Sequence, residues 1–382
     1  MSCPADDLPE WAHAVALAGL PYMTWDRLAR VLAGPGGEGE PATTADGGRG
    51  ARRPWSPAEA WQRVVAGGWG EGLARAAAAT PLAEVADAHR RAGVAVHLLG
   101  GEGFPAALAH DHEAPPVLFS FGDLAVLQGP RVGIVGTRRA TGYGRDVARQ
   151  LGRELAEAGV AVVSGLALGI DGAAHEGALG ARAPAAPPVG VVGSGLDVVY
   201  PRRHADLWRR VALAGVLLSE APLGARPEPW RFPARNRLIA ALADVLVVVE
   251  SHAAGGSLHT VRAAAERGVT VMAVPGPVRS PASAGTNALL ADGCPPARDS
   301  GDVLVALALE TAAAPPRPDR RPPPTGEEAA VLDALGWQPV TVEELVEATS
   351  LPPSRVALAL ARLEQDGWAR GRGGWWERVA PS

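Results

Sequence analysis

Between residues 131 and 310, short runs of aliphatic and β-branched residues alternate with amphipathic helical patterns. The runs are RVGIVG, VAVVSG, VGVVG, GVLLSE, DVLVVVE and VTVMAVPG, and helices are expected over 144–158, 171–179, 204–213, 234–242, 257–267 and 286–292. Continuous apolar runs are typical of strands buried on both faces, and repeated alternation of strand and helix indicates a parallel sheet between two helical layers. The pattern therefore predicts a doubly wound, mostly parallel α/β domain.

The segment before this domain is predicted to be mainly helical. Residues 8–33 have the pattern of two short helices around GLPY, with Thr24 as the N-cap of the second, as in a helix-hairpin-helix or SAM-like (sterile-alpha-motif-like) unit. Residues 34–58 are rich in Gly and Pro, which predicts a poorly ordered excursion before a helix that starts near Pro57. Between 81 and 128, VAVHLLG and APPVLFSFG predict a strand and an extended segment that leads into the central domain.

The segment after the central domain begins with TAAAPPRPDRRPPPT, which predicts a semi-rigid polyproline linker. Helical patterns at 326–336, 341–348 and 353–366 are followed by WARGRGGWWERV, a predicted hairpin with a Gly/Arg tip. Three helices and a hairpin indicate a winged helix. We therefore expect an N-terminal helical domain at 1–80, the α/β domain at 81–310, the linker at 311–325 and the winged helix at 326–382.

Composition narrows the class of protein. No apolar run approaches the roughly 20 residues of a membrane span, since LIAALADVLVVV at 238–249 is short and contains Asp244. The first residues carry acids where an export signal carries basic residues. Cys3 and Cys294 are too few for a disulfide framework or a thiolate metal site. We therefore expect a cytoplasmic protein without a membrane segment, bound metal or cofactor.

Charge is distributed unevenly along the chain. All 36 basic residues are arginine, which fits a GC-biased genome, and the overall charge of −5 argues against a uniformly basic nucleic-acid binder. Residues 131–310 contain 19 arginines and 16 acids, whereas 1–130 and 311–382 have net charges of −6 and −2. Only the central segment therefore has the sign expected of a domain that binds a polyanion.

Glycine, hydroxyl and arginine residues follow the predicted strands. The motifs are GTR at 136–138, SG at 164–165, GSG at 193–195, PARNR at 233–237, GGS at 255–257, and PG at 275–276 with GTN at 285–287. Parallel strands end at one edge of the sheet, where helix N-termini present free N–H groups. Glycine lets backbone approach an oxyanion, and arginine supplies donors to it. We therefore predict an anion-binding surface along this edge.

Arginines at these positions have two interpretations. Arg235 is expected in the first turn of its helix, where a cation opposes the helix dipole by roughly 0.3–1 kcal/mol. Such a residue requires an anion, either a bound phosphate or a nearby acid. The same choice holds for Arg138, and Arg202 with Arg203 in VVYPRRH is either a phosphate clamp or a solvated surface pair.

Several common chemistries are not indicated. VGIVGTRRATGYG does not match GxGxxG, and GxxxxGK[ST] is absent, so neither a dinucleotide fingerprint nor a P-loop is present. Ser164, Asp171 and His175 are the residue types of a catalytic triad, but Asp171 fits a helix N-cap and His175 lies one turn later on the same face. His204, His252 and His259 lack the spacing and acidic neighbours of a metal site.

The motifs, taken together, resemble those of the bacterial DNA-processing protein A family, also called DprA or Smf. The matching segments are VGTRRATGYG at 135–144, SGLALGIDGAAHEGAL at 164–179, GSGLDVVYP at 193–201, FPARNRLIAAL at 232–242, GGSLHTVRAA at 255–264, VPG at 274–276 and GTNALLADG at 285–293. A looser match at 104–123 extends the resemblance over about 85–310. It implies a non-catalytic Rossmann-like domain that binds and protects single-stranded DNA, forms a homodimer and loads the RecA recombinase during natural transformation or DNA recombination.

The resemblance also assigns residues. In the family, the arginine of the first GTR or GSR turn and the basic residue after YP contact DNA phosphates, which corresponds to Arg138 and Arg202. The other candidates in its turns are Gly136, Thr137, Ser164, Gly165, Gly193, Ser194, Arg235, Asn236, Arg237, Gly255, Gly256 and Ser257. The chain departs from the family at His204, where asparagine is frequent, and in GGSLHT, which replaces the commoner SGSLIT, so that the packing around His259 stays open.

Two other functions are compatible with this fold. Rossmann-like enzymes that release the base of nucleoside monophosphates carry PGGxGTxxE. Here the aligned positions hold Leu258, His259 and Arg262, so their catalytic carboxylate is missing. A sensor that binds a small nucleotide in the same turns and signals through the winged helix stays open.

The flanking units are also ambiguous. The predicted wing carries Arg370 and Arg372 beside Trp375 and Trp376, which suits DNA, but its module is net acidic, which suits a protein partner equally. The acidic N-terminal helical unit is expected to be structural or to bind a partner.

Overall fold

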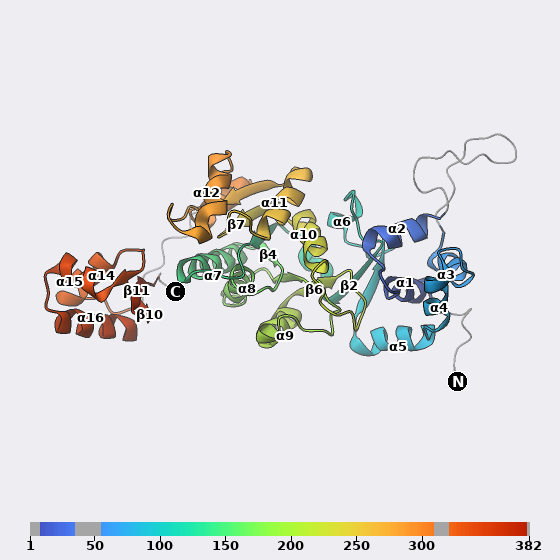
Figure 1. Ribbon diagram of the computed structural model, residues 1–382, viewed down its shortest axis with the longest axis horizontal. Helices are drawn as coiled ribbons and strands as arrows, with labels where there is room; N and C mark the ends of the chain where they lie inside the picture. Colours follow the sequence, from blue (N-terminus) through green and yellow to red (C-terminus); the bar gives the residue numbers. More distant parts are fainter. Residues whose placement is uncertain (1–7, 35–54, 309–320, 380–382) are drawn as a thin grey trace.

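A computed structural model describes residues 8–34, 55–308 and 321–379. Five N-terminal helices lie at one end of the molecule, the α/β domain occupies the middle, and the winged helix lies at the other end (Figure 1). The predicted excursion at 34–58 and linker at 311–325 fall largely outside the described residues. Within those residues, no helix is both long enough and apolar enough to span a bilayer.

Eight strands form one mostly parallel sheet, as predicted. They are β1 (Ala95–Leu98), β2 (Val117–Gly122), β3 (Arg131–Val135), β4 (Ala161–Ser164), β5 (Val189–Val191), β6 (Val216–Ser219), β7 (Val245–Val248) and β8 (Thr270–Ala273). Their order is β1-β2-β6-β5-β4-β3-β7-β8, with β3 to β8 parallel and β1 and β2 antiparallel at one edge. The predicted strand and extended segment before residue 128 therefore belong to this sheet.

Alternate residues of the central strands enter different cores. In β3, Val132 and Ile134 join a cluster with helices α7 and α8, whereas Val135 joins a cluster with α10 and α11. The helices of the domain are α6 (Ala106–Ala109), α7 (Gly142–Glu157), α8 (Ile170–Leu179), α9 (Ala205–Ala214), α10 (Arg231–Leu242), α11 (Ser257–Glu266), α12 (Ala284–Ala291) and α13 (Ser300–Ala306). Burial on both faces explains why these strands lack polar alternation.

Strand order changes direction at β3. This strand pairs with β4 on one side and with β7 on the other, in the registers Val132↔Val162 and Gly133↔Leu246. In doubly wound sheets, ligands bind outside the carboxyl ends of the strands at such a reversal. We call the carboxyl ends of β3 and β7 the switch point.

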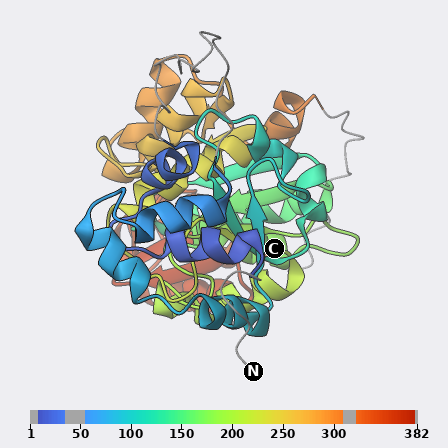
Figure 2. The same cartoon turned by 90° about the vertical axis from the view of Figure 1, so that its right-hand side faces the viewer.

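The N-terminal helices share a hydrophobic core with the sheet. They are α1 (Glu10–Ala18), α2 (Trp25–Ala33), α3 (Pro57–Val65), α4 (Glu71–Ala78) and α5 (Leu82–Ala92). Thr24 caps α2 by accepting a hydrogen bond from the Arg27 N–H at 3.4 Å, which confirms that prediction. Leu17 of α1 belongs to one cluster with Phe119 of β2 and Trp208 of α9. Figure 2 shows these helices lying across the central domain.

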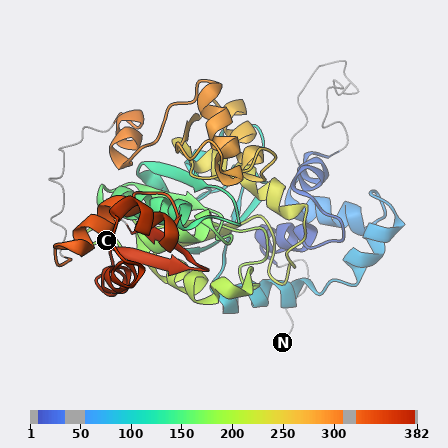
Figure 3. The same ribbon diagram turned by 60° about the vertical axis from the view of Figure 1, so that its left-hand side comes forward.

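The winged helix has its own core and touches helix α7. It consists of α14 (Glu327–Leu335), β9 (Val340–Thr341), α15 (Val342–Thr349), α16 (Pro353–Gln365), β10 (Ala369–Arg372) and β11 (Trp375–Arg378). Val331, Leu360 and Leu363 lie at the centre of its apolar cluster. Its hairpin lies beside α7 (Figure 3), where the Arg370 Nη1 is 3.8 Å from the Asp146 Oδ2.

Candidate nucleic-acid interface

The predicted site residues lie along one edge of the sheet, but some are exposed to solvent and others are buried. Arg138, Arg202 and Gly256 are exposed, and Gly136, Thr137, Asn236 and Gly255 are partly exposed. The remaining predicted residues are buried: Ser164, Gly165, Gly193, Ser194, Arg235, Arg237 and Ser257. Sequence order therefore locates the edge correctly, whereas only part of the predicted set reaches solvent.

Four exposed arginines flank this edge. Arg138 and Arg139 follow β3, and Arg202 and Arg203 begin a 3-10 turn, η3 (Arg202–His204). Within the described residues, none of the four guanidinium groups forms an ion pair. We call these residues the arginine rim; the buried Asp171 carboxylate interacts with Arg138 only at long range, without an ion pair.

Backbone hydrogen bonds brace the turn that carries Arg138. The Thr137 N–H donates to the Glu250 carbonyl at 2.8 Å, and the Ile170 N–H donates to the Thr137 carbonyl at 3.3 Å. A Cβ atom on Gly136 would overlap Ile170 and the Glu250 carbonyl, so glycine is required for this close packing. The first predicted glycine thus has a steric role, and the turn holds Arg138 above the sheet.

Aromatic rings join the two halves of the rim. The Arg138 guanidinium lies 4.9 Å from the centroid of Phe232, and the rings of Phe232 and Tyr200 are 5.3 Å apart. Tyr200 is 41% exposed and Trp230 is 39% exposed. Sequence analysis did not select these three residues, which we call the aromatic group. The available signal was aromatic residues beside arginines in VYPRR and WRFPAR, in a chain with only 5% aromatic residues.

The histidine departures do not disturb the edge. The Nδ1 of His204 lies 3.0 Å from the Leu166 carbonyl, and its ring fills the space beside Gly172. It therefore fastens η3 to the exit of β4. His259 is exposed on α11, so its side chain does not take part in the packing of that helix.

Arg235 corrects a prediction. Helix α10 begins at Arg231, three residues earlier than expected, so Arg235 lies in the second turn and is only 4% exposed. Its Nη1 donates to the Gly165 carbonyl at 2.8 Å and also to the Val191 carbonyl. Burial lowers the pKa of Arg235 to about 10, so it stays charged at neutral pH. The Arg235 Nη1 is therefore directed to backbone inside the domain and does not face a surface anion.

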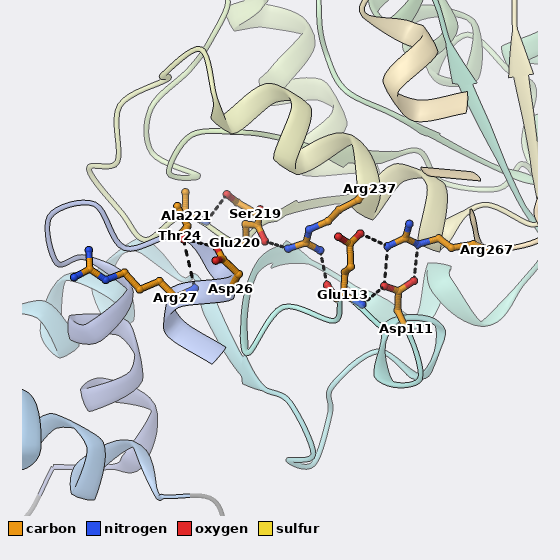
Figure 4. A network of polar contacts seen from close by, with 10 residues as sticks. All are labelled: Thr24, Asp26, Arg27, Asp111, Glu113, Ser219, Glu220, Ala221, Arg237 and Arg267. Carbon is orange, nitrogen blue, oxygen red and sulfur yellow. Dashed lines mark hydrogen bonds and ion pairs between the residues drawn. The ribbon is translucent and has the colours of Figure 1, made fainter. Parts of the chain in front are cut away.

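Arg237 also lies inside the protein and not at a phosphate-binding surface. It forms an ion pair with Glu220, and its Nη1 donates to the Glu113 carbonyl at 2.7 Å. The Trp25 ring of α2 lies 4.3 Å from its guanidinium. Figure 4 shows this pair beside a second one, in which Arg267 contacts the Asp111 and Glu113 carboxylates at 2.6 and 2.7 Å. The Arg237 contacts join α10 to neighbouring segments, and the Arg267 contacts join the end of α11 to the segment that holds Asp111 and Glu113.

The predicted serines donate to protein atoms. The Ser164 hydroxyl donates to the Ile134 carbonyl at 2.6 Å, and the Ser194 hydroxyl to the Val198 carbonyl at 2.7 Å. The Ser257 hydroxyl donates to the Ser251 Oγ at 2.9 Å. Their protons are therefore used within the strand exits, and these residues shape the edge from inside.

The residue types of a triad make separate contacts. Asp171 is the second residue of α8, not its N-cap, and its carboxylate accepts a hydrogen bond from the Gly165 N–H at 3.1 Å. The Nε2 of His175 donates to the Val189 carbonyl at 3.1 Å, and burial lowers the pKa of His175 to about 4. Since the Ser164 proton also goes to a carbonyl, no relay from serine through histidine to aspartate is formed. Across residues 8–34, 55–308 and 321–379, no three His, Cys, Asp or Glu side chains are grouped as metal ligands.

An acid that sequence analysis missed lies at the switch point. Glu250 follows β7 and is 2% exposed. Its carboxylate accepts hydrogen bonds from the Thr141 N–H at 2.9 Å and the Thr141 hydroxyl at 2.6 Å. Thr141 is the N-cap of α7, so this carboxylate sits at the start of the first helix after β3. The signal in the sequence was an acid at the end of the apolar run DVLVVVE.

Comparison with known proteins gives consistent matches over most of the chain. A family model described as DNA recombination-mediator protein A matches residues 95–308, and one described as DprA winged helix domain matches 314–374. The chain is 42% identical over 269 residues to a DNA processing protein DprA of Mycobacterium tuberculosis, which covers 69% of this chain and 68% of that protein.

Two solved structures are similar in fold. DNA processing protein A from Streptococcus pneumoniae has a TM-score of 0.59 at 29% identity, covering 80% of this chain and 99% of that one. The same protein from Helicobacter pylori, solved to describe its single-stranded DNA binding mode, has a TM-score of 0.50 at 30% identity and covers 56% of this chain and 95% of that one.

Proposed function

This chain belongs to the DNA recombination-mediator protein A family, which includes DprA and Smf, and from this premise we propose that its α/β domain binds single-stranded DNA. The H. pylori relative was solved for its single-stranded DNA binding mode, which supports this ligand. The observation that carries the proposal for this chain is the arginine rim, in which four exposed guanidinium groups have no ion pair within the described residues.

The rim suits phosphates. Binding of DNA to unpaired arginines releases counterions from the nucleic acid, and this release is the main source of sequence-independent affinity. Arg138 and Arg202 are the proposed phosphate contacts on the two sides of the aromatic group. Gly136 and Thr137 brace the turn below Arg138, and buried Arg235 and Arg237 support the same edge from inside.

The aromatic group suits unpaired bases. One side of Phe232 is covered by Arg138, whereas Tyr200 and Trp230 keep substantial exposed ring surface. Bases of a single strand stack on such rings with little sequence preference, at about 1–3 kcal/mol per base. Bases of a duplex are already stacked and cannot do so. A combined arginine and aromatic surface therefore favours single strands over duplex.

The test compares fluorescent single- and double-stranded oligonucleotides of equal length across salt concentrations, by gel shift or anisotropy. We expect the single strand to bind more tightly than the duplex. The slope of log K against log salt concentration should be smaller in magnitude by about 0.7 in Arg138→Ala, and by about the same amount in Arg202→Ala. Arg298→Ala is the matched control, since Arg298 is exposed but paired with Asp302 at 2.7 Å. Equal binding of both DNA forms, or slopes unchanged in both rim variants, would contradict the proposal.

Family membership also supports a physiological role. We propose that the protein acts in the cytoplasm as a homodimer that protects incoming DNA and loads RecA onto it during natural transformation or DNA recombination. Assembly of RecA filaments on DNA coated with single-strand binding protein tests loading, and sedimentation equilibrium tests the dimer. A purely monomeric protein that leaves RecA assembly unchanged would contradict this role.

We propose no catalytic step. In this chain, Arg262 stands where the base-releasing enzymes have their catalytic acid, and it is exposed on α11. A panel of nucleoside monophosphates assayed for released base checks this, and turnover that is lost on changing Ser257 or Arg262 would overturn it.

A further inference from the structure

We propose that Glu250 determines the specificity of this domain for polynucleotide over free nucleotides, by acting as a fixed internal anion at the switch point. Its carboxylate occupies the start of α7, where doubly wound domains commonly hold a nucleotide phosphate. The inference rests on the proposed function in one respect, that DNA is the ligand of the arginine rim. The position of the Glu250 carboxylate at the switch point is a separate observation.

Local geometry directs the carboxylate onto the helix. Segment 141–144, TGYG, opens α7, which is 16 residues long. A Cβ atom on Gly144 would overlap the Glu250 carboxyl group. The space beside this glycine, through which a phosphate could approach the backbone, is therefore filled by the Glu250 carboxyl group. The Thr141 N–H and hydroxyl, which would be donors for a bound phosphate, both donate to Glu250.

Electrostatics favour this arrangement. Glu250 is 2% exposed and forms no ion pair with any basic residue in the described ranges. A buried carboxylate requires compensation, and here the two Thr141 hydrogen bonds and the positive end of the α7 dipole supply it. Desolvation by burial, followed by the nearby Glu250 carboxylate, raises the pKa of the Tyr143 hydroxyl.

The consequence is a choice between ligands. A mononucleotide or dinucleotide has few phosphates and needs a strong binding site for them. At this switch point its phosphate would be repelled by the Glu250 carboxylate, and the Thr141 donors would already be hydrogen-bonded. A polynucleotide presents many phosphates in a row and can bind the exposed rim without entering the switch point. Glu250 thereby separates the two classes of ligand that the same fold can bind.

The experiment uses two variants of the full chain. Glu250→Ala removes the carboxylate from the start of α7, and Glu250→Gln keeps a side chain of similar size there without the charge. The probes are inorganic phosphate and pyrophosphate, with sodium chloride at equal ionic strength as the reference. We expect the melting temperature of Glu250→Ala to rise saturably with either probe, with apparent binding at least about tenfold tighter than in Glu250→Gln. Wild type should show no saturable response.

A matched control removes a second acid at the N-terminal end of this helix. The Glu377 carboxylate of the wing lies against Gly142 but is not bonded to Thr141. Glu377→Gln leaves Glu250 in place, so its melting temperature should not depend on phosphate. A merely structural role for Glu250 would lower the stability of Glu250→Ala without an anion-specific recovery.

Two results would overturn the inference. One is a folded Glu250→Ala variant with no response to phosphate or pyrophosphate. The other is saturable binding of pyrophosphate or AMP by the wild-type protein, together with protection of residues 137–144 from hydrogen exchange. This second result would refute the inference even if Glu250→Ala does not fold. Single-strand binding is measured on the same wild-type sample; its absence would refute the proposed function and leave the phosphate results to be judged separately.

Discussion

Two sets of arginines at the same edge of the sheet have opposite environments. Arg138 and Arg202 are exposed and unpaired within the described residues, whereas Arg235 and Arg237 are 4% and 5% exposed and bonded to protein oxygens. All four follow predicted strands in glycine- or proline-containing motifs. The difference teaches that an arginine at a strand exit indicates an anion site only when the fold leaves its guanidinium in solvent.

The two sets therefore contribute to different properties. A buried arginine has lost its hydration, and its hydrogen bonds compensate for that loss only while every partner is present. An exposed arginine keeps its hydration and affects stability little, so its charge is available to a ligand. Substitutions at buried positions should change folding, and substitutions on the rim should change DNA binding.

The largest expected effect is at the buried set. Arg237→Met should lower the free energy of unfolding by about 3–5 kcal/mol, because the largely buried Glu220 carboxylate, 15% exposed, loses its ion-pair partner. Denaturant unfolding measures this. The double variant Arg237→Met with Glu220→Met should recover much of the loss, since no buried charge then lacks a partner. A loss below about 1 kcal/mol in the single variant would show that the ion pair is dispensable.

A pH dependence comes next and tests the same buried layer. Burial lowers the pKa of His175 to about 4, from its usual 6.5, so the unfolded chain binds a proton in this range and the folded chain does not. Stability should therefore fall as pH decreases from 6.5 toward 4, by up to about 1.4 kcal/mol per pH unit. The raised pKa values of Asp171 and Glu220 act in the opposite direction.

Comparison with His175→Gln isolates the histidine contribution. The difference in unfolding free energy between wild type and the variant should shrink as pH falls through this window. A difference that stays constant with pH would mean that His175 takes up its proton with the same pKa in the folded protein as in the unfolded chain.

The aromatic group should affect DNA affinity without affecting salt dependence. Tyr200→Leu keeps an apolar side chain but removes the ring, so it should weaken single-strand binding by about 1–3 kcal/mol if one base stacks there. The salt slope should be that of wild type, because no phosphate contact is lost. Anisotropy titrations at several salt concentrations measure both quantities, and a reduced slope would place a phosphate contact at this position.

The smallest expected effect is a charge-conserving change on the rim. Arg138→Lys should keep the salt slope of wild type while losing the planar contact with Phe232, so affinity should decrease only modestly. The unfolding free energy should stay within about 0.5 kcal/mol of wild type, as is usual for surface sites. A stability loss comparable to that of Arg237→Met would remove the distinction between rim and buried set.

The helices and strands were predictable from the sequence because their signals are local. The apolar runs, the Thr24 cap, the helix start at Pro57 and the wing hairpin all depend on residues within a few positions of one another. The family motifs also placed the candidate residues along one edge of the sheet. The start of α10 was misplaced because Pro233 suggested the first turn, whereas the helix begins at Arg231.

Local sequence patterns are sufficient to predict the parallel sheet, its helical layers, the winged helix and the position of Arg138 and Arg202 at strand exits. The depth of each side chain depends on the folded protein, because the contacts that bury a side chain come from distant segments. Arg235 meets Gly165 across 70 positions, Arg237 meets Glu113 across 124, and Glu250 meets Thr141 across 109. Local patterns carry no information on such pairs, so the buried supports and the occupied switch point emerge only when the chain is folded.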